Sequence, residues 1–257
     1  MMGCHHAREP MSVEAPLDLL NYLTTQYGLK TEVTNIVNNQ EVWIVPMVNP
    51  DGHVYCETTD QNWRKNRKNN GDGTFGVDNN RNYSYKWGLD NVGSSNQGGS
   101  DTYRGTGPNS ELENQHVRDF MAQHNFFSSI SFHSYGQYVI YPWGYGYNLH
   151  APDHLTFNVS ADSMNNSNGY SIGTAPELLY LVNGEYCDWA YGETTQKPLN
   201  YGYTMELGTT FYPAQSQVQG ILDEVRPSMT YLIRSAQPAA GEATVTLSTH
   251  AITLARG

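Results

Sequence analysis

The sequence predicts an α/β fold, in which helices cover a β-sheet. Segments with apolar residues at helical spacing alternate with short apolar runs of the kind that form buried strands. Two of these runs end directly before His133 and at Glu206, and ligands of open α/β sheets bind beyond the carboxyl ends of the strands. At 257 residues the chain is long enough for one large domain with its own core.

Composition argues against several classes of function. Fourteen basic residues stand against twenty-five acidic ones, which makes nucleic acid an unsuitable partner because phosphate contacts dominate that affinity. The sequence has no run of about 18 apolar residues, so we expect no membrane span. Met1–Cys4 has no apolar signal-peptide core. Cys4, Cys56 and Cys187 permit one disulfide but no disulfide framework.

The first half of the chain is predicted to contain one helix, one strand and a long irregular segment. Met11–Tyr27 has apolar residues at helical spacing, with Gly28 at the expected C-terminal cap. Glu41–Val48 is a continuous apolar run that predicts a buried strand, ended by a turn at Asn49–Gly52. His53–Pro108 is rich in Asn, Gly, Asp and Arg, and so long an irregular segment is typical of a functional loop.

The second half is predicted to contain four helices and three strands. The helices are expected at Asn109–His124, Ala151–Asn168, Glu185–Tyr191 and Gln215–Ser235, the last with a kink or break at Pro227. The strands are expected at Phe126–Phe132, Tyr138–Tyr141 and Tyr201–Leu207. Because the composition changes after Gln237, we expect one domain over residues 1–236 and a tail or linker over 237–257.

Three residues form the best candidate for a metal site. His6 and Glu9 have His-x-x-Glu spacing, and one imidazole with one carboxylate suits a borderline-soft ion such as Zn²⁺. His133, at the end of a predicted strand, is the best third ligand. His5 could compete with His6, but neighbouring residues of an extended segment point in opposite directions.

The motifs together resemble the zinc carboxypeptidases of the carboxypeptidase A type, in the family's order and at similar spacings. They cover residues 3 to about 236 and read Gly3-Cys4-His5-His6-Ala7-Arg8-Glu9, Asn49-Pro50-Asp51-Gly52, Trp63-Arg64-Lys65, Asp78-Asn79-Asn80-Arg81-Asn82, Ser131-Phe132-His133-Ser134-Tyr135 and Thr204-Met205-Glu206-Leu207.

The resemblance implies a role for each matching residue. It implies that one Zn²⁺ per chain is bound by His6, Glu9 and His133, that Glu206 is the general base and that Arg64 stabilises the oxyanion. Substrate binding is implied for Asn80, Arg81 and Tyr180, which hold the terminal carboxylate, and for Arg8 and Tyr135, while Asp78 orients the first histidine. The implied function is hydrolysis of the C-terminal peptide bond of peptides and proteins by a secreted monomer.

The residue types suit this chemistry independently of the resemblance. Three protein ligands leave zinc an open position for water, whose pKa falls to about 7. A carboxylate such as Glu206 can accept that proton and pass it to the leaving amine. Zinc and a guanidinium together stabilise the negative charge that develops on the carbonyl oxygen. Arg81 suits a planar carboxylate better than lysine would.

The resemblance also implies a mixed, mostly parallel twisted sheet flanked by helices, of the phosphorylase/hydrolase-like zinc exopeptidase type. Relatives carry further catalytic-domain sequence before the metal stretch, so we expect the chain to be truncated at its N-terminus and to lack the first strands. Matching the relatives predicts cis peptide bonds at Ser134–Tyr135, Pro142–Trp143 and Gly208–Thr209.

Substrate preference is predicted from the position before Asp188-Trp189, which matches the base of the family's side-chain pocket. Cys187 occupies it, and burying a substrate ammonium there without a carboxylate would be costly. We therefore expect apolar and aromatic C-terminal residues to be preferred, unless Glu185 reaches the pocket and admits basic ones.

Two alternatives from other classes remain open. A zinc-dependent deacylase of the aspartoacylase type shares His-x-x-Glu and a later histidine, but the Arg64, Asn80–Arg81 and Tyr180 set fits a peptide carboxylate better. A truncated, inactive peptide-binding relative would keep the fold without the chemistry.

Overall fold

The computed structural model of the chain describes residues 1–236, so the predicted tail over 237–257 lies outside the described residues. The helices are α1 (Met11–Gln26), α2 (Thr31–Asn39), α3 (Pro50–Thr58), α4 (Leu112–Ala122), α5 (His154–Asn165), α6 (Ala175–Leu178), α7 (Tyr186–Gly192) and α8 (Gln215–Ser235), with a 3₁₀ turn η1 at Asn79–Arg81. The strands are β1 (Ser128–His133), β2 (Tyr138–Ile140), β3 (Ser171–Gly173) and β4 (Tyr201–Glu206).

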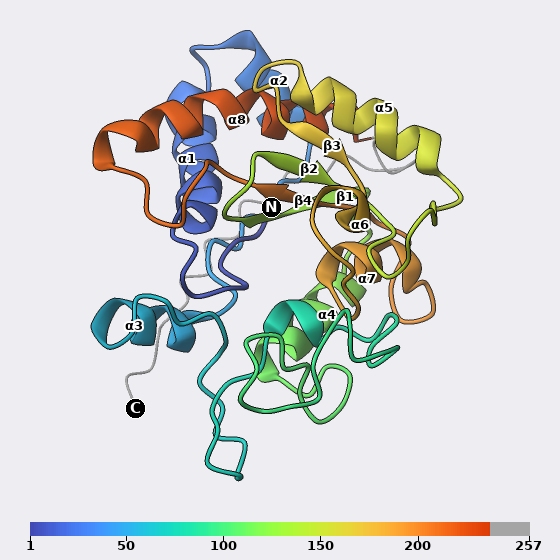
Figure 1. Cartoon of the computed structure of the whole chain (residues 1–257). Coiled ribbons are helices and arrows are strands. Elements are labelled where there is room, and N and C mark those ends of the chain that lie inside the picture. Colours follow the sequence, from blue (N-terminus) through green and yellow to red (C-terminus); the bar gives the residue numbers. More distant parts are fainter. Residues whose placement is uncertain (237–257) are drawn as a thin grey trace.

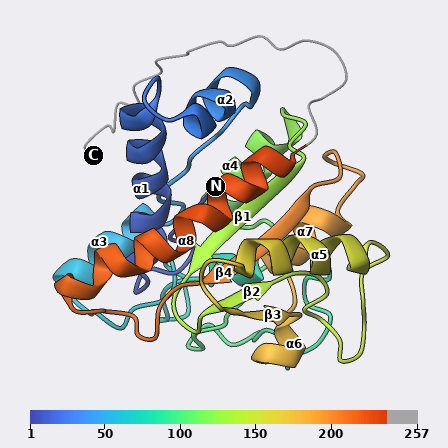
Figure 2. The same ribbon diagram turned by 90° about the horizontal axis from the view of Figure 1, so that it is seen from above.

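The sheet of the described chain is mixed and mostly parallel, as predicted. Its strand order is β1-β4-β2-β3 (Figure 2). The β1–β4 and β2–β3 pairs are parallel, and the β2–β4 pair is antiparallel. Met2 adds parallel bridges to Ser131 of β1 and to Val45.

Alternation along β1 and β4 separates a packing face from a functional face. Ile130 and Phe132 of β1, with Tyr203 and Met205 of β4, pack into the large apolar cluster that includes α1, α2, α5 and α8. Figure 1 shows α2, α5 and α8 on that side of the sheet, with α4 and α7 on the other. Since side chains alternate along a strand, His133 and Glu206 point away from the large cluster.

The second face carries a smaller core. It contains Val117 and Met121 of α4, Trp189 of α7 and Tyr83 of the long irregular segment, all buried. The Tyr83 and Trp189 rings stack with centroids 5.0 Å apart. This core fixes α7 and the irregular segment beside the ends of β1 and β4.

The irregular segment was predicted correctly from residue 59 onward, apart from the short turn η1. Backbone hydrogen bonds hold it against the rest of the molecule. The Ala7 N–H donates to the Arg64 carbonyl at 2.9 Å, and the Tyr83 N–H donates to Gly184 at 2.9 Å. The candidate functional residues of this segment therefore lie on a loop that these two hydrogen bonds hold in place.

The predicted strand Glu41–Val48 is wrong. Its side chains from Val42 to Met47 are only half-buried, and Val45 alone bridges another residue. The Val45 N–H donates to Met1 and its carbonyl accepts from Gly3. Because this short pairing builds no ladder among the described residues, an apolar run alone was insufficient to define a strand.

The predicted turn at Asn49–Gly52 is the start of α3 instead. Asn49 is the N-cap, and its Oδ1 accepts from the Gly52 N–H at 3.0 Å. Pro50 occupies the first helical position, where its missing N–H costs nothing. The sequence also missed α2, α6 and β3, which are short and bury few apolar residues.

Three smaller expectations concern Pro227, the cysteines and a membrane span. The α8 helix continues through Pro227 without a break. All three cysteines are free and buried, so the permitted disulfide is not formed. Within residues 1–236, no helix is long and apolar enough to cross a membrane.

Candidate active site

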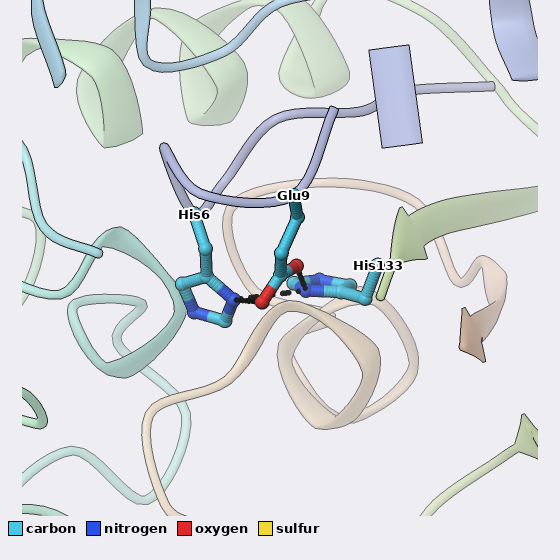
Figure 3. Close-up of side chains that lie close together, drawn as sticks. All are labelled: His6, Glu9 and His133. Atoms are coloured by element: carbon cyan, nitrogen blue, oxygen red, sulfur yellow. Dashed lines mark hydrogen bonds and ion pairs between the residues drawn. The ribbon is translucent and has the colours of Figure 1, made fainter. Parts of the chain in front are cut away.

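Three predicted ligands meet at the carboxyl end of β1. The turn after Cys4 presents His6 and Glu9, and β1 ends at His133 (Figure 3). His6 Nδ1 lies 2.9 Å from Glu9 Oε1, and His133 Nδ1 lies 2.9 Å from Glu9 Oε2. All three side chains are buried, and their potential ligand atoms lie within 4.8 Å of one another. The donor set of two imidazoles and one carboxylate fits Zn²⁺.

Hydrogen bonds on the far side of each ring favour this use. His6 Nε2 lies 3.0 Å from Asp78 Oδ1, and His133 Nε2 lies 3.0 Å from Ser131 Oγ. With a proton on each Nε2, both lone pairs are on Nδ1 and point to the centre of the cluster. Outer partners of this kind fix the tautomer and orientation of a ligating histidine.

His5 does not compete for the centre. Its Nδ1 lies 3.0 Å from Ser131 Oγ and its Nε2 lies 2.7 Å from the Tyr83 hydroxyl. Burial lowers the pKa of His5 well below its usual value, with His133 the next largest cause, so the ring is neutral. A buried chain of hydrogen bonds thus runs from His133 through Ser131 and His5 to Tyr83.

Arg64 is fixed beside the cluster by Asp78. Its Nε and Nη2 lie 3.0 and 2.9 Å from Asp78 Oδ2, and its Nη1 lies 4.0 Å from Glu9 Oε1. Burial alone would raise the pKa of Asp78, but Arg64 and then His6 lower it well below the usual range. Asp78 is therefore an anion that orients both a potential metal ligand and a cation.

A cleft of about 340 Å³ contains most of the predicted residues. All three cluster residues line it, together with Arg8, Arg64, Asn80, Arg81, Tyr135, Tyr180, Glu185 and Glu206. Glu206 reaches it because its backbone pairs with His133 at the ends of parallel strands. Burial raises the pKa of Glu206 well above its usual value, and Glu9 adds to that shift.

Asn80 and Arg81 are held with donors to spare. Asn80 Oδ1 accepts from the Tyr186 N–H at 2.8 Å, which leaves its NH₂ group free to donate elsewhere. Arg81 Nη1 donates to the Asn80 carbonyl at 2.7 Å, while Arg81 Nε has no partner in the described chain. Tyr180 is half-exposed at the same cleft.

Arg8 and Tyr135 lie on the outer part of the cleft. Arg8 Nη1 contacts the Asn62 carbonyl at 3.0 Å and Asp101 Oδ2 at 3.2 Å, and its guanidinium lies 4.9 Å from the centre of the Phe211 ring. Tyr135 packs edge-on against the same ring at 4.9 Å. Phe211, which sequence reasoning missed, therefore joins the two predicted residues.

The expectation for Cys187 is wrong. Its side chain is fully buried, and its thiol contacts the Ile140 and Gly202 carbonyls at 3.8 and 3.3 Å, away from the cleft lining. Burial raises the pKa of this thiol well above its usual value. Glu185, two residues earlier, lines the cleft instead.

Two of the three expected cis peptide bonds are present, at Ser134–Tyr135 and Pro142–Trp143. The expectation of a third at Gly208–Thr209 is wrong, because that bond is not cis. Sequence reasoning also missed the roles of Ser131 and His5. Alternating polar residues along β1 were the available signal, since Ser131 shares its face with His133.

Comparison with known proteins finds similar sequences over most of the chain. A family model described as zinc carboxypeptidase matches residues 1–228. Carboxypeptidase A2 of Rattus norvegicus is 34% identical over 217 residues, covering 80% of this chain and 50% of the rat protein. Carboxypeptidase B of Astacus astacus is 35% identical over 219 residues, covering 81% of this chain and 69% of that protein.

A solved structure of a known protein has a similar fold. The crystal structure of thrombin activatable fibrinolysis inhibitor superposes with a TM-score of 0.82 at 29% identity, covering 91% of this chain and 63% of that one. The chain spans about half the length of several relatives, including the rat protein. The match to the family model, which extends over most of the sequence, shows that the chain belongs to the zinc carboxypeptidase family.

Proposed function

We propose that the chain carries the catalytic centre of a zinc-dependent exopeptidase that hydrolyses the C-terminal peptide bond of peptides and proteins. One observation carries the proposal. A single cleft is lined by the potential metal ligands, by Glu206 and by the Arg64 and Arg81 guanidiniums. The potential metal ligands and Glu206 suit hydrolysis, and the two guanidiniums suit the binding of anions. Together these groups match a peptide with a free terminal carboxylate.

In this proposal His6, Glu9 and His133 hold the zinc. The bound ion would supply an acidified water and an electrophile for the scissile carbonyl. Asp78 and Ser131 keep the two imidazoles oriented toward the centre. The chain thereby fixes the geometry that zinc chemistry requires.

Glu206 is proposed as the group that moves the proton. It lies opposite His133 in the β1–β4 register, on the cleft side of the sheet. A carboxylate there can accept a proton from water and donate it to the leaving amine. Arg64, held by Asp78, is proposed to stabilise charge on the substrate's carbonyl oxygen.

The terminal carboxylate of the substrate is proposed to bind Asn80, Arg81 and Tyr180. The NH₂ group of Asn80 and the Nε of Arg81, which has no partner within residues 1–236, supply donors inside the cleft. Arg8 and Tyr135 are proposed to contact the substrate further out. The apolar lining residues Ile140, Ala175, Leu179 and Val182 support acceptance of apolar and aromatic C-terminal side chains.

A blocked dipeptide with a free carboxylate, its amide and a short N-acyl amino acid together test the proposal. The zinc-loaded chain should hydrolyse the free dipeptide, slow strongly on the amide and lose the activity to a chelator. Glu206→Gln should keep the metal and lose about 10²–10⁴-fold in turnover. Preference for the short N-acyl amino acid would favour the deacylase, and binding without hydrolysis would favour the peptide-binding relative.

Peptide or protein C-termini are thus the proposed partners of a monomeric chain. An extracellular location, which the family resemblance implies, belongs to the same proposal. Fractionation of the producing cells tests it, since accumulation inside them would contradict it.

A further inference from the structure

Glu185 is a buried carboxyl group that the proposed catalytic steps do not use. Its side chain is 4% exposed and lines the same cleft as the cluster residues. Its Oε1 atom has no hydrogen-bond partner within residues 1–236. Buried polar atoms are nearly always satisfied in folded proteins, so an unsatisfied one in a cleft is a position at which a ligand or a water molecule can bind.

The backbone makes room for this carboxyl group. Glu185 precedes α7 in an extended conformation with φ −86° and ψ 161°. A Cβ atom added at Gly144 would lie 2.1 Å from Glu185 Oε1 and 2.3 Å from Val182 Cγ2. Only glycine at position 144 therefore permits the carboxyl group to occupy its place.

The cleft that Glu185 lines combines apolar and polar side chains. Ile140, Ala175, Leu179 and Val182 line the cleft with it. The same cleft contains Arg81, proposed to hold the substrate's terminal carboxylate. A C-terminal side chain extending from that carboxylate would enter a cleft that offers both these apolar side chains and the Glu185 carboxyl group.

We propose, on the basis of the proposed function, that Glu185 is the specificity-determining residue of the side-chain pocket and pairs with the cation of C-terminal lysine or arginine. Apolar side chains bind the walls without using the carboxyl group. The pocket thus accepts both classes, and position 187 plays no part in the choice.

The charges around Glu185 allow this dual use. Burial raises the pKa of Glu185 to about 7, and Arg81 opposes that shift. Glu206 and Asp188 are the nearby acids whose own pKa values Glu185 raises, and the Cys187 thiol is affected in the same way. A neutral carboxyl group tolerates an apolar side chain, and a substrate cation favours the charged form.

The test compares blocked dipeptides that end in Leu, Phe, Lys and Arg. Wild-type chain should hydrolyse all four. At pH 8, Glu185→Gln should lower kcat/KM for the Lys and Arg peptides by about tenfold or more, with Leu and Phe changed far less. Cys187→Ala is the matched control and should leave the ratios unchanged. Unchanged Lys and Arg hydrolysis in Glu185→Gln would overturn the inference.

The pH dependence of the wild-type chain provides a test that does not depend on the folding of a variant. In wild-type chain, the ratio of kcat/KM for Arg to Leu peptides should rise with pH through about 7, as the carboxylate forms. Catalytic groups shared by both substrates cancel in this ratio. A flat ratio would contradict the role of Glu185.

Calorimetric binding of N-acetyl-arginine and N-acetyl-leucine separates this inference from the proposed function. If no peptide is hydrolysed but N-acetyl-arginine binds and loses affinity in Glu185→Gln, the exopeptidase proposal fails and the pocket assignment stands. If Leu peptides are hydrolysed but N-acetyl-arginine does not bind, the pocket assignment fails alone. If neither ligand binds, both fail.

Discussion

The Nε2 atom of His6 lies 3.0 Å from Oδ1 of Asp78, and this contact joins the N-terminal turn to a loop more than seventy residues away. The second oxygen of Asp78 binds Arg64. One buried carboxylate therefore sets both the tautomer of a potential metal ligand and the position of the cation beside it.

Asp78→Asn tests this dual role. The amide would present an NH₂ group to His6 or to Arg64, and each of these already donates a proton. We expect metal affinity to fall by about 10–100-fold, with turnover reduced further. Titration with zinc in the presence of a competing chelator measures the affinity. Asp119→Asn, at an exposed ion pair on α4, should change nothing, and equal affinities in both variants would contradict the role.

Ser131→Ala removes the link between His133 and His5. We expect about tenfold weaker metal binding because His133 loses the partner of its Nε2. Ser129→Ala is a close control, since Ser129 lies on the same face of β1 but bonds Asn200 and Tyr186. Both variants should lower the unfolding midpoint, but only Ser131→Ala should weaken the metal. Equal metal affinities would show that the link has no influence on the centre.

Gly184→Ala should destabilise the fold next to the cleft. Gly184 has φ +69°, and an added Cβ would lie 2.5 Å from the Arg81 carbonyl oxygen. Gly28 has φ +76° with nothing within 4 Å, so Gly28→Ala isolates the backbone term of about 1–2 kcal/mol. Urea unfolding should show a clearly larger loss for Gly184→Ala. Equal losses of unfolding free energy in the two variants would mean that the backbone at Arg81 shifts away from the added Cβ at no energetic cost.

The stability of the chain should depend on pH through Glu185. Its pKa is raised from 4.5 to about 7 in the folded chain, so the unfolded chain releases this proton first as pH rises. The contribution of Glu185 to the free energy of unfolding therefore decreases between about pH 4.5 and 7 and is constant above that range. One pKa unit is worth about 1.4 kcal/mol. Between these pH values, the free energy of unfolding of Glu185→Gln should therefore rise by about 3 kcal/mol relative to that of wild type. A difference independent of pH would contradict the shift.

The site was largely predictable because its ligands lie where sequence patterns are strong. His6 and Glu9 share a turn, and His133 and Glu206 end strands whose apolar residues alternate with polar ones. Parallel pairing then brings both strand ends together. The pairing of β1 with β4 is the long-range step, and the other steps depend on residues that are close in sequence.

Predictions failed where a side chain's direction depends on its neighbours. Cys187 is the second residue of α7 and faces the β2 and β4 backbones, whereas Glu185 precedes the helix and points to the cleft. Because each helical residue turns by about 100°, the direction of Cys187 depends on the residue at which α7 starts. The run Glu41–Val48 failed for a related reason, since strand formation requires hydrogen-bonding neighbours that an apolar pattern does not reveal.

The central claim is that His6, Glu9 and His133 form one zinc site, and metal analysis of the folded, dialysed chain tests it most directly. Wild type and His116→Ala, which changes an exposed histidine of α4, should each retain about one zinc per chain, the stoichiometry of a three-ligand site. His133→Ala should retain far less. Equal zinc content in His133→Ala and His116→Ala would contradict the account.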